Sequence, residues 1–530
     1  MNRSDALSRI TSRAEPFDMA IIGGGATGVG VALDAASRGY SVALVEQSDF
    51  GEGTSSRSTK LIHGGVRYLQ QGNISLVMEA LKERGLLRQN APHLVRDLGF
   101  IVPNYAWWEA PFYGIGMKVY DMLAGKYGFG KSAHLSRDDV LRRIPTLETR
   151  GLRGGVLYYD GQFDDSRLLI NLAQTATQQG AALVNYAKVT ALSKDQDGFV
   201  NGLTFTDLET GASHAIGARA VINATGAFSD AVRTMDDPAA KPMIAPSQGI
   251  HLVLDGSFLG RDTAIMVPRT SDGRVMFAIP WHGRALLGTT DTPIPTAELE
   301  PVPMEEEIHF ILETAGRYLA RPPTRADVKS VFTGIRPLVK AGDTGNTAAL
   351  ARDHTINISN SGLLTIAGGK WTTYRKMAED TVDHAATLGR LDDRPCRTRT
   401  LNIHGHHGHA SQFGELSVYG SDAPAIRQLM ADAPGGDTPL HPDLPLYAAQ
   451  IVWAARVEMA RTVDDVLARR TRSLLLDARA AIAVAAAVAR ILAAELGRDA
   501  AWAAAQVDAF TTIAQHYLID APRAPRAGAA

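Results

Sequence analysis

Residues 17–28 read FDMAIIGGGATG, an apolar run followed by the glycine spacing GxGxxG at Gly23, Gly25 and Gly28. The apolar run predicts a buried strand, and residues 29–39 predict a helix of small residues that ends at a glycine. In such a unit the first glycine makes the turn, the second admits a pyrophosphate to the backbone, and the third allows close packing of helix and strand. The N-terminus of the helix attracts the same anion. The stretch therefore predicts an α/β dinucleotide-binding unit.

A second predicted strand, residues 41–45, ends at Glu46, which comes 21 residues after Gly25. A carboxylate at this place can accept hydrogen bonds from a ribose diol, and its charge would repel a 2′-phosphate. The strand, glycine turn, helix, second strand and terminal acid together are more specific than a GxGxxG alone. The alternative is a glycine-rich turn in an unrelated α/β unit. The motif does not distinguish NAD from FAD.

Later segments favour FAD. A hydroxyl-rich loop at 54–60 is followed by HGG at 63–65, and small polar residues suit the close passage of a flat ring or a pyrophosphate. The strand at 220–223 ends in Ala-Thr-Gly, and Val189, after another short strand, is placed to contact an adenine. The strand at 363–367 enters a glycine turn and a helix start, which would stabilise negative charge on a flavin. Each segment alone is also compatible with an ordinary strand–helix turn.

Together these segments define the residues that we expect to bind the cofactor. They come from the first glycine turn, the end of the second strand, the hydroxyl-rich loop and the two later strand ends. The expected cofactor-binding residues are Gly23, Gly25, Ala26, Thr27, Gly28, Glu46, Gln47, Thr54, Ser55, Ser56, Lys60, Leu61, His63, Gly64, Gly65, Val189, Ala224, Thr225, Gly226, Gly369, Lys370 and Thr372.

With these motifs the sequence resembles the aerobic, FAD-dependent glycerol-3-phosphate dehydrogenases over about residues 15–520. The resemblance rests on blocks that include HGGVRY at 63–68, GIRPL at 334–338, GGKWTTYR at 368–375 and EMARTVDDVL at 458–467, of which HGG-x-RY and GGKWTT are specific. The resemblance implies an α/β (α+β overall) fold. Its parts are a Rossmann-like FAD-binding domain of the glutathione-reductase/D-amino-acid-oxidase type, an antiparallel-sheet substrate cap and a helical C-terminal domain.

The resemblance also implies the reaction. It is the oxidation of sn-glycerol 3-phosphate to dihydroxyacetone phosphate by hydride transfer from C2 to N5 of FAD, with electrons passing to ubiquinone or menaquinone. A glycerol-3-phosphate oxidase that uses oxygen would share the fold and the substrate site. An amine or amino-acid oxidase on the same fold would need a clamp for a carboxylate rather than a phosphate. The formal net charge of −2 disfavours nucleic acid as a partner, and with it an FAD-dependent RNA-modifying protein.

A phosphate ester needs positive donors, and arginine binds phosphate bidentately. Arg336, in the stiff context GIRPL, is expected to clamp the phosphate, and Arg67 with Tyr68 adds a second cation and a hydroxyl. Lys370 is a further charge that would serve either the substrate or the flavin. Each of these cations is also compatible with a structural salt bridge. Arg352 is a weaker candidate, because the next residue is an aspartate with which it can pair.

Oxidation of the substrate alcohol requires a base that removes the proton of its hydroxyl group. Such a base must be neutral near the operating pH and is usually an imidazole. His251 lies in an alternating strand, and the resemblance places it in the substrate pocket. By its spacing alone, a single histidine in a strand is more often a core residue. His63 is a competing candidate that we expect to line the flavin instead. We therefore predict His251, Arg336 and Lys370 as catalytic residues and Arg67, Tyr68, Arg336, Lys370 and Arg352 as substrate-binding residues.

The length of 530 residues predicts several domains, because single cores stop growing at roughly 250–300 residues. Alternating runs at 274–280 and 284–288 predict an antiparallel sheet in the cap, and helical spacing after residue 440 predicts the C-terminal domain. The expected ranges are a tail at 1–14, a discontinuous FAD-binding domain at 15–90, 155–235 and 330–395, a cap at 91–154 and 236–329, and a helical domain at 400–525, packed on the FAD domain.

The single cysteine, Cys396, excludes an intramolecular disulfide framework and Cys-based zinc clusters, and it favours a reducing compartment. Residues 1–17 lack the apolar core of a signal peptide, and the apolar run at 480–489 is about half of the ~20 residues that a membrane helix needs. We therefore expect a cytoplasmic protein. His404, His406, His407 and His409 are compatible with transition-metal binding, but we favour an exposed linker and predict no metal site.

Eight aromatic residues lie between positions 105 and 129, with Lys118 and Lys126 among them. Aromatic and basic residues on an amphipathic segment are typical of a membrane interface, whereas the alternative is an aromatic core of the cap. We expect a peripheral location on the inner face of the plasma membrane. A homodimer is compatible with the sequence but not indicated by it.

Overall fold

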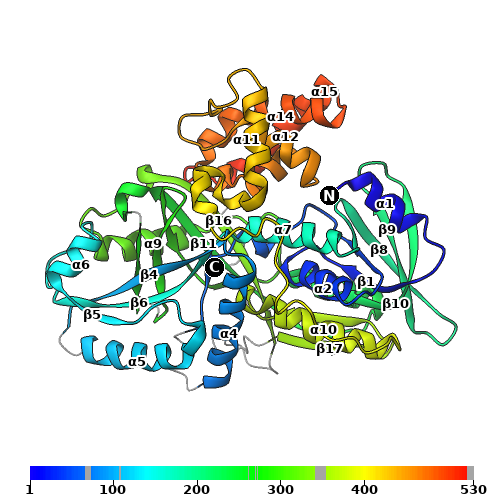
Figure 1. The fold of residues 1–530 in the computed structure, drawn as a ribbon, viewed down its shortest axis with the longest axis horizontal. Helices are drawn as coiled ribbons and strands as arrows, with labels where there is room; N and C mark the ends of the chain where they lie inside the picture. The colour runs from blue at the N-terminus through cyan, green and yellow to red at the C-terminus, as the bar shows by residue number, and fades with distance from the viewer. Residues whose placement is uncertain are drawn as a thin grey trace, which may run out of the picture.

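In the computed structural model the described residues are 1–65, 73–106, 109–260, 262–268, 270, 273–340 and 354–521, without the side chains of 110–113, 115 and 126. Within them the chain forms two sheets that lie side by side, and the C-terminal helices lie above both (Figure 1). This arrangement confirms the predicted mixed α/β fold with a helical C-terminal region.

The first sheet is built on the apolar strand of residues 17–22. Its strands are β1 (Phe17–Ile22), β2 (Val42–Val45), β7 (Ala182–Val184), β8 (Ala187–Lys194), β9 (Val200–Asp207), β10 (Ser213–Asn223), β17 (His354–Ile358) and β18 (Leu364–Gly368). Parallel pairing gives the order β18-β10-β1-β2-β7, with β17 antiparallel at the edge. The first half of β10 continues into an antiparallel ribbon with β9 and β8. Because β2 and β7 are buried along their length, they are short runs of apolar residues rather than alternating strands.

Five helices accompany this sheet in the described chain: α1 (Arg3–Thr11), α2 (Ala26–Ser37), α7 (Asp165–Gln178), α8 (Ser229–Asp236) and α10 (Tyr374–Leu388). The predicted helix of small residues is α2, which packs against α7 and α10. Gly28 must be glycine, because a Cβ there would lie 2.0 Å from the carbonyl oxygen of Gly23. Gly23 itself has a φ of 109°, a conformation that favours glycine. The quoted stretch therefore folds as predicted.

The second sheet is largely antiparallel. Its strands are β3 (Leu61–Ile62), β4 (Val95–Asn104), β5 (Ala133–Ser136), β6 (Gly154–Phe163), β11 (Ile244–Asp255), β12 (Thr263–Val267), β13 (Met276–Trp281), β14 (Arg284–Gly288), β15 (Thr292–Pro293) and β16 (Val328–Val339). The main path runs β15-β11-β14-β13-β12-β4-β6-β3, with β16 beside β11 and β5 beside β6. The helices α4 (Ile74–Asn90), α5 (Glu109–Ala124), α6 (Arg137–Arg143) and α9 (Glu305–Tyr318) belong to this half. The predicted antiparallel sheet is thus present, and the two alternating runs form the hairpin β13–β14.

Some of the expected domain ranges need correction. Residues 155–163 and 330–339 were assigned to the FAD-binding segments, but β6 pairs with β4 along its length and β16 pairs with β11, so both belong to the second sheet. Residues 1–14 were expected to be a tail, whereas residues 3–11 form α1. Arg3 of α1 is buried and donates to Asp207 at 2.5 Å, so this helix is anchored on the first sheet.

The C-terminal region consists of α11 (Ala423–Asp432), α12 (Ala448–Val457), the π-helix η9 (Asp465–Arg470), α13 (Ser473–Leu476), α14 (Ala478–Leu496) and α15 (Ala500–Gln515). Short 3₁₀ helices elsewhere are η1 (Thr54–Ser56), η2 (Gly125–Tyr127), η3 (Gly226–Phe228), η4 (Gly256–Phe258), η5 (Arg325–Asp327), η7 (Trp371–Thr373) and η8 (Ala410–Asp422). The apolar side chains of the C-terminal helices form one buried cluster with those of the second sheet. We expected the helical C-terminal domain to pack on the FAD domain, but its apolar side chains also pack on the second sheet. In the described chain, no helix combines the length and the apolar character that crossing a membrane requires.

Candidate cofactor and substrate site

A cavity of about 510 Å³ opens at the carboxyl ends of β1, β2, β10 and β18. Ligands of doubly wound sheets bind at this edge, where the strand order reverses about the first strand. Of the predicted cofactor-binding residues, those that line the cavity are Gly23, Gly25, Ala26, Thr27, Glu46, Gln47, Thr54, Ser55, Val189, Ala224, Thr225, Gly226, Gly369 and Lys370. Five separate segments of sequence (residues 23–27, 46–55, 189, 224–226 and 369–370) thus meet at one cavity.

Glu46 is held at the end of β2 by two backbone amides. Gly24 N–H donates to its Oε2 at 2.5 Å, and Ser48 N–H donates to its Oε1 at 2.8 Å. Burial raises the pKa of Glu46, and these backbone hydrogen bonds oppose the shift. Each carboxylate oxygen can accept a further hydrogen bond. The side chain is therefore oriented to receive the hydroxyls of a ribose.

The hydroxyl-rich loop is fixed to three other elements. Ser55 Oγ accepts from the N–H of Ala26 at 2.9 Å, which places the loop at the N-terminus of α2. Trp371 Nε1 donates to the Ser55 carbonyl at 2.9 Å, and Thr54 Oγ1 donates to the carbonyl of Ile335 in β16 at 2.5 Å. The loop therefore joins the glycine turn, the second sheet and η7 around one cavity.

Several predicted cofactor residues lie off the cavity wall: Gly28, Ser56, Lys60, Leu61, His63, Gly64, Gly65 and Thr372. Gly28 acts in helix–strand packing, as described above. Lys60 is fully buried, and its Nζ donates to Asp165 at 2.7 and 3.0 Å and to the Ser56 carbonyl at 2.7 Å. Burial lowers the pKa of Lys60, and Asp165 opposes that shift. Lys60 therefore forms a buried ion pair, and its direct contact with a cofactor is a prediction that the geometry does not support.

Other residues of the cavity wall were missed by sequence reasoning. Trp371 stands in the GGKWTT block that was singled out, and Glu52 stands between two glycines just before the hydroxyl-rich loop, so both had a local signal. Leu299 and Pro337 also line the cavity, but they come from the segments of the second sheet. Pro337 stands in the GIRPL block that was linked to the substrate phosphate, whereas nothing in the local sequence of Leu299 indicates a nucleotide, and the packing of the two sheets brings both to the cavity.

His251 and Arg336 lie on the adjacent antiparallel strands β11 and β16. His251 is 3% exposed, and its ring stacks on Phe332 with centroids 4.8 Å apart. Its Nε2 is 2.9 Å from Thr59 Oγ1, whereas its Nδ1 has no hydrogen-bond partner among the described residues. Burial lowers the pKa of His251 well below its usual value, and Lys60 and Arg336 add to the effect. The imidazole is therefore neutral at physiological pH.

Arg336 has a partly exposed side chain, at 28%. Its Nη1 donates to Asp291 Oδ1 at 3.1 Å, and its Nη2 donates to the Thr290 carbonyl at 3.0 Å. A Cβ at Gly249 would lie 2.7 Å from both terminal nitrogens, so only glycine leaves room for the guanidinium. Arg336 therefore forms the salt bridge that was the alternative interpretation, with Asp291, and its guanidinium remains partly exposed.

The remaining predicted substrate residues divide into two groups. Lys370 lines the cavity at the start of η7. Arg67, Tyr68 and Arg352 lie outside the described residues. The structure thus brings the predicted base beside one predicted phosphate clamp, and it places Lys370 with the cofactor cavity.

The histidine-rich stretch is partly built into the fold. His404 Nε2 lies 2.7 Å from Asp422 Oδ2, and its Nδ1 lies 2.8 Å from Gln178 Nε2, while the ring of His407 packs edge-on against Phe413. In the described part of the chain, no group of three or more His, Cys, Asp or Glu side chains is arranged to hold a metal ion.

Comparison with known proteins gives a consistent result. The protein-family model for FAD-dependent oxidoreductases matches residues 18–375, and that for the C-terminal domain of alpha-glycerophosphate oxidase matches residues 364–503. A probable mitochondrial glycerol-3-phosphate dehydrogenase of Caenorhabditis elegans is 42% identical over 96% of this chain and 74% of its own. The mitochondrial glycerol-3-phosphate dehydrogenase of Schizosaccharomyces pombe is 38% identical over 95% and 87%. The crystal structure of the Bacillus halodurans glycerol-3-phosphate dehydrogenase complexed with FAD has a TM-score of 0.79 and 29% identity, and the match covers 99% of each chain.

Proposed function

The chain belongs to the FAD-dependent oxidoreductases and, among them, to the glycerol-3-phosphate dehydrogenases, and on this basis we propose that it oxidises sn-glycerol 3-phosphate to dihydroxyacetone phosphate. The observation that carries the proposal is identity of 38–42% with enzymes of that name across almost the whole chain. The test is anaerobic addition of glycerol 3-phosphate to the purified flavoprotein. The flavin absorbance near its visible maximum should bleach, and no bleaching would overturn the choice of substrate.

The cavity suits FAD. The backbone of the glycine turn is open at Gly25, the N-terminus of α2 faces the same space, and Glu46 is oriented for a ribose. Bound FAD supplies a two-electron acceptor. The chain would hold it through Gly23–Thr27 and Ser55 on one side and through Thr225 and Gly369 on the other.

The protein groups proposed to act on the substrate are His251 and Arg336. Because the pKa of His251 is depressed, its imidazole is neutral and can accept the proton of the substrate hydroxyl. In the tautomer whose Nε2–H donates to Thr59 Oγ1, the lone pair lies on Nδ1. Arg336, oriented by Asp291, is proposed to bind the phosphate, with Arg67, Tyr68, Lys370 and Arg352 as further substrate residues.

The clamp can be tested by Arg336→Ala. We expect this variant to keep its FAD, because Arg336 does not line the cofactor cavity, and to lose turnover. Activity like that of the wild type would refute the phosphate role. Thr59→Val is the corresponding test of His251, since it removes the hydroxyl that faces Nε2 while keeping the volume. It should lower kcat and shift the pH dependence of kcat, whereas an unchanged pH profile would argue against His251 as the base.

We propose a membrane quinone, ubiquinone or menaquinone, as the electron acceptor. The match to the C-terminal domain of alpha-glycerophosphate oxidase makes an oxygen-using oxidase the second candidate. Turnover with a quinone analogue under nitrogen, compared with peroxide formation in air, separates the two. A rate that depends on oxygen and is indifferent to quinone would favour the oxidase.

A peripheral contact with the membrane is proposed at α4 and α5, which pack together at the lower edge of the molecule in Figure 1. Three apolar side chains are exposed there: Ile74 at 53%, Met78 at 46% and Met122 at 75%. Of the predicted aromatic residues, Tyr120 and Phe129 are buried and therefore belong to the core, which corrects their interfacial assignment. Trp107 and Trp108 lie outside the described residues, as do the side chains of Phe112, Tyr113 and Lys126. Failure to sediment with anionic liposomes would refute the contact.

A further inference from the structure

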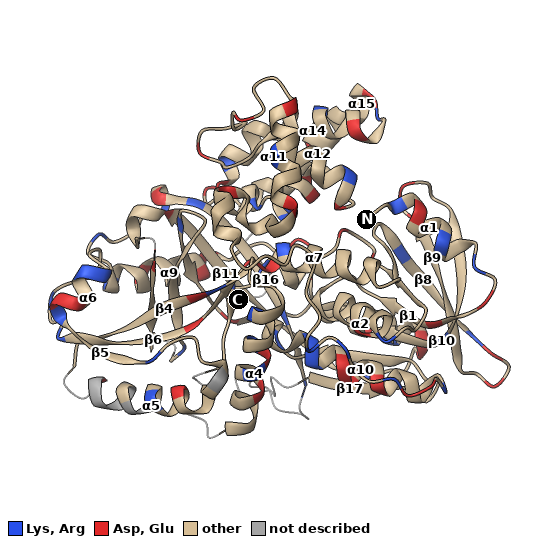
Figure 2. Ribbon diagram, viewed as in Figure 1, with Lys and Arg blue, Asp and Glu red and all other residues tan. Residues whose placement is uncertain are grey.

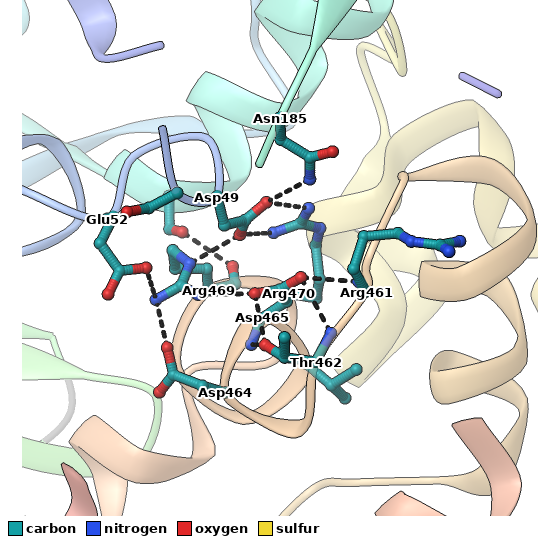
Figure 3. Close-up of polar contacts among 12 residues, drawn as sticks. Asp49, Glu52, Asn185, Arg461, Thr462, Asp464, Asp465, Arg469 and Arg470 are labelled. Carbon is teal, nitrogen blue, oxygen red and sulfur yellow. Dashed lines mark hydrogen bonds and ion pairs between the residues drawn. The ribbon is translucent and has the colours of Figure 1, made fainter. Parts of the chain in front are cut away.

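Four carboxylates surround the guanidinium of Arg469 in the π-helix η9 (Figure 3). Arg469 Nε donates to Asp49 Oδ2 at 2.6 Å, and its Nη2 donates to Asp465 Oδ1 at 2.8 Å. Its Nη1 lies 2.9 Å from Glu52 Oε2 and 2.7 Å from Asp464 Oδ2. Asp464 and Asp465 belong to the C-terminal region, whereas Asp49 and Glu52 belong to the loop after β2. One side chain therefore joins two parts of the chain that are about 420 residues apart.

The Asp49 end of this contact is rigid. Arg470 donates to both oxygens of Asp49, at 2.6 and 2.9 Å, and Asn185 Nδ2 lies 3.2 Å from Oδ1 (Figure 3). Arg469, Arg470 and Asp49 are all at most 2% exposed. Although burial opposes ionisation, Arg470 and Arg469 lower the pKa of Asp49 to about 2. Asp49 is thus a charged anchor whose position is determined by two arginines of the C-terminal region.

The Glu52 end of this contact faces the cofactor cavity. Glu52 lines the cavity, together with its neighbours Gly51 and Gly53 and the hydroxyl-rich loop that follows, whereas Arg469 does not line it. Both flanking residues are glycines, so the segment has little intrinsic stiffness. Its position therefore depends on contacts made from outside, and the Glu52 carboxylate makes such a contact with Arg469.

The charges at this joint are unbalanced. Asp49, Glu52, Asp464 and Asp465 face Arg469 and Arg470, so four acids meet two guanidiniums. Burial raises the pKa of Glu52 well above its usual value, and Asp464 adds to that shift. Glu52 and Asp464 share one nitrogen of Arg469. Removal of that guanidinium would leave Glu52 on the cavity wall, and Asp464 next to it, without the cation that they share, which is costly in a low-dielectric interior.

We propose that Arg469 is a positioning residue for cofactor binding, which holds the cavity-wall segment from Asp49 to Ser55 in place through its contacts with Asp49 and Glu52. The helical C-terminal region then contributes to FAD affinity although Arg469 itself does not reach the cavity. The inference concerns cofactor binding alone, so its failure would leave the proposed substrate untouched.

The test measures the dissociation constant of FAD by titrating apo-protein and following the quenching of flavin fluorescence, without substrate. Arg469→Gln should weaken FAD binding by roughly tenfold or more. Glu52→Gln alone should change it by less than about twofold, because the amide oxygen still accepts from Arg469. In the Arg469→Gln background, Glu52→Gln should recover about threefold or more, because it removes a carboxylate left without its cation. This recovery distinguishes positioning through Glu52 from a general loss of structure.

The matched control is Arg456→Gln, which breaks a bidentate pair with Glu495 in the same helical region and should leave FAD affinity unchanged. If Arg469→Gln does not give folded apo-protein, Arg469→Lys preserves the charge but cannot reach four carboxylates. It should still weaken FAD binding several-fold at an unchanged apo-protein Tm. The proposal is overturned if the folded Arg469 variant binds FAD like the wild type, if Arg456→Gln weakens binding equally, or if Glu52→Gln brings no recovery.

Discussion

Against the second sheet the C-terminal region buries mainly apolar side chains, whereas its contact with the first-sheet half includes a cluster of buried ions. The apolar contact includes Ile451, Val466 and Leu467 of the helices with Val253 and Phe332 of the sheet. The ionic contact joins Arg469 and Arg470 to Asp49, and Glu458 to Arg167 of α7. Figure 2 shows charged residues along the boundary between the C-terminal helices and the first sheet, near α7.

The two contacts differ in what they specify. Apolar packing is non-directional and tolerates a change of shape at constant volume. A buried ion pair adds little net stability, but it has a defined geometry and does not tolerate the loss of one partner. The apolar contact therefore holds the helices on the molecule, and the ionic contact sets their register against the cofactor half.

The largest effect should come from a half-broken ion pair. Arg167 donates to Glu458 at 2.8 and 2.6 Å, and both side chains are at most 1% exposed. Glu458→Ala leaves a buried guanidinium unpaired and should lower the free energy of unfolding by about 3–5 kcal/mol. Chemical denaturation measures the change. The double variant Arg167→Met/Glu458→Leu should recover most of it, and an equal loss in the double variant would contradict the distinction between the contacts.

Acid should weaken the ionic contact specifically. The pKa of Asp49 is about 2 in the folded chain, against 3.8 for an ordinary aspartate. Because the folded value is the lower one, this stabilisation is present above pH 3.8 and is lost as the pH falls toward 2. The loss amounts to roughly 2 kcal/mol. Comparison of unfolding at pH 6 and pH 3 should show a shallower pH dependence in Asp49→Asn than in the wild type. An identical pH dependence of the unfolding free energy in the two proteins would mean that Asp49 does not contribute to it.

The apolar contact should respond only to lost volume. Ile451 of α12 is fully buried in the cluster shared with the second sheet. Ile451→Val removes one methylene and should cost about 1 kcal/mol of unfolding free energy. Its FAD affinity should equal that of the wild type, since no ionic partner is moved. A marked loss of FAD in this variant would show that any disturbance of the helices reaches the cofactor.

The smallest effect is expected at the surface. Arg479 pairs with Asp520 at 2.7 Å, but both side chains are more than half exposed. Arg479→Gln should therefore change the unfolding free energy by less than about 1 kcal/mol. Thermal unfolding provides the measurement, and a change as large as that of Glu458→Ala would mean that exposure does not separate the two kinds of ion pair.

The local part of this architecture could be predicted, and the long-range part could not. The strand 17–22, the glycine turn, the helix after it and the hairpin β13–β14 follow from patterns within a few residues. Val189 and Thr225 were also placed on the cavity wall from their own strand ends. By contrast, Lys60 was predicted to bind the cofactor, whereas it forms a buried ion pair with Asp165. Asp165 is distant in the sequence, and no pattern near Lys60 predicts this contact. Likewise, β6 and β16 were assigned to the wrong sheet, because an apolar strand does not indicate its neighbour.

The same limit applies to Arg469. The block at 458–467 was singled out, and its helical spacing was interpreted as simple packing. Two consecutive arginines after an apolar helix are usually a solvated end. Here both arginines lie in a π-helix and are buried in ion pairs with Asp49, which belongs to a distant part of the sequence.

The separation of about 420 residues between Asp49 and Arg469 also has a consequence for the order in which the protein is made. At a synthesis rate of roughly 5–20 residues per second, the loop that carries Asp49 and Glu52 is made about 20–80 s before its arginines exist. During that interval Asp49 and Glu52 lack the arginines that contact them in the folded chain, so the cavity-wall segment is without two of its contacts. The nascent chain should therefore capture FAD firmly only near the end of translation, and a protein truncated before η9 should accumulate without its flavin.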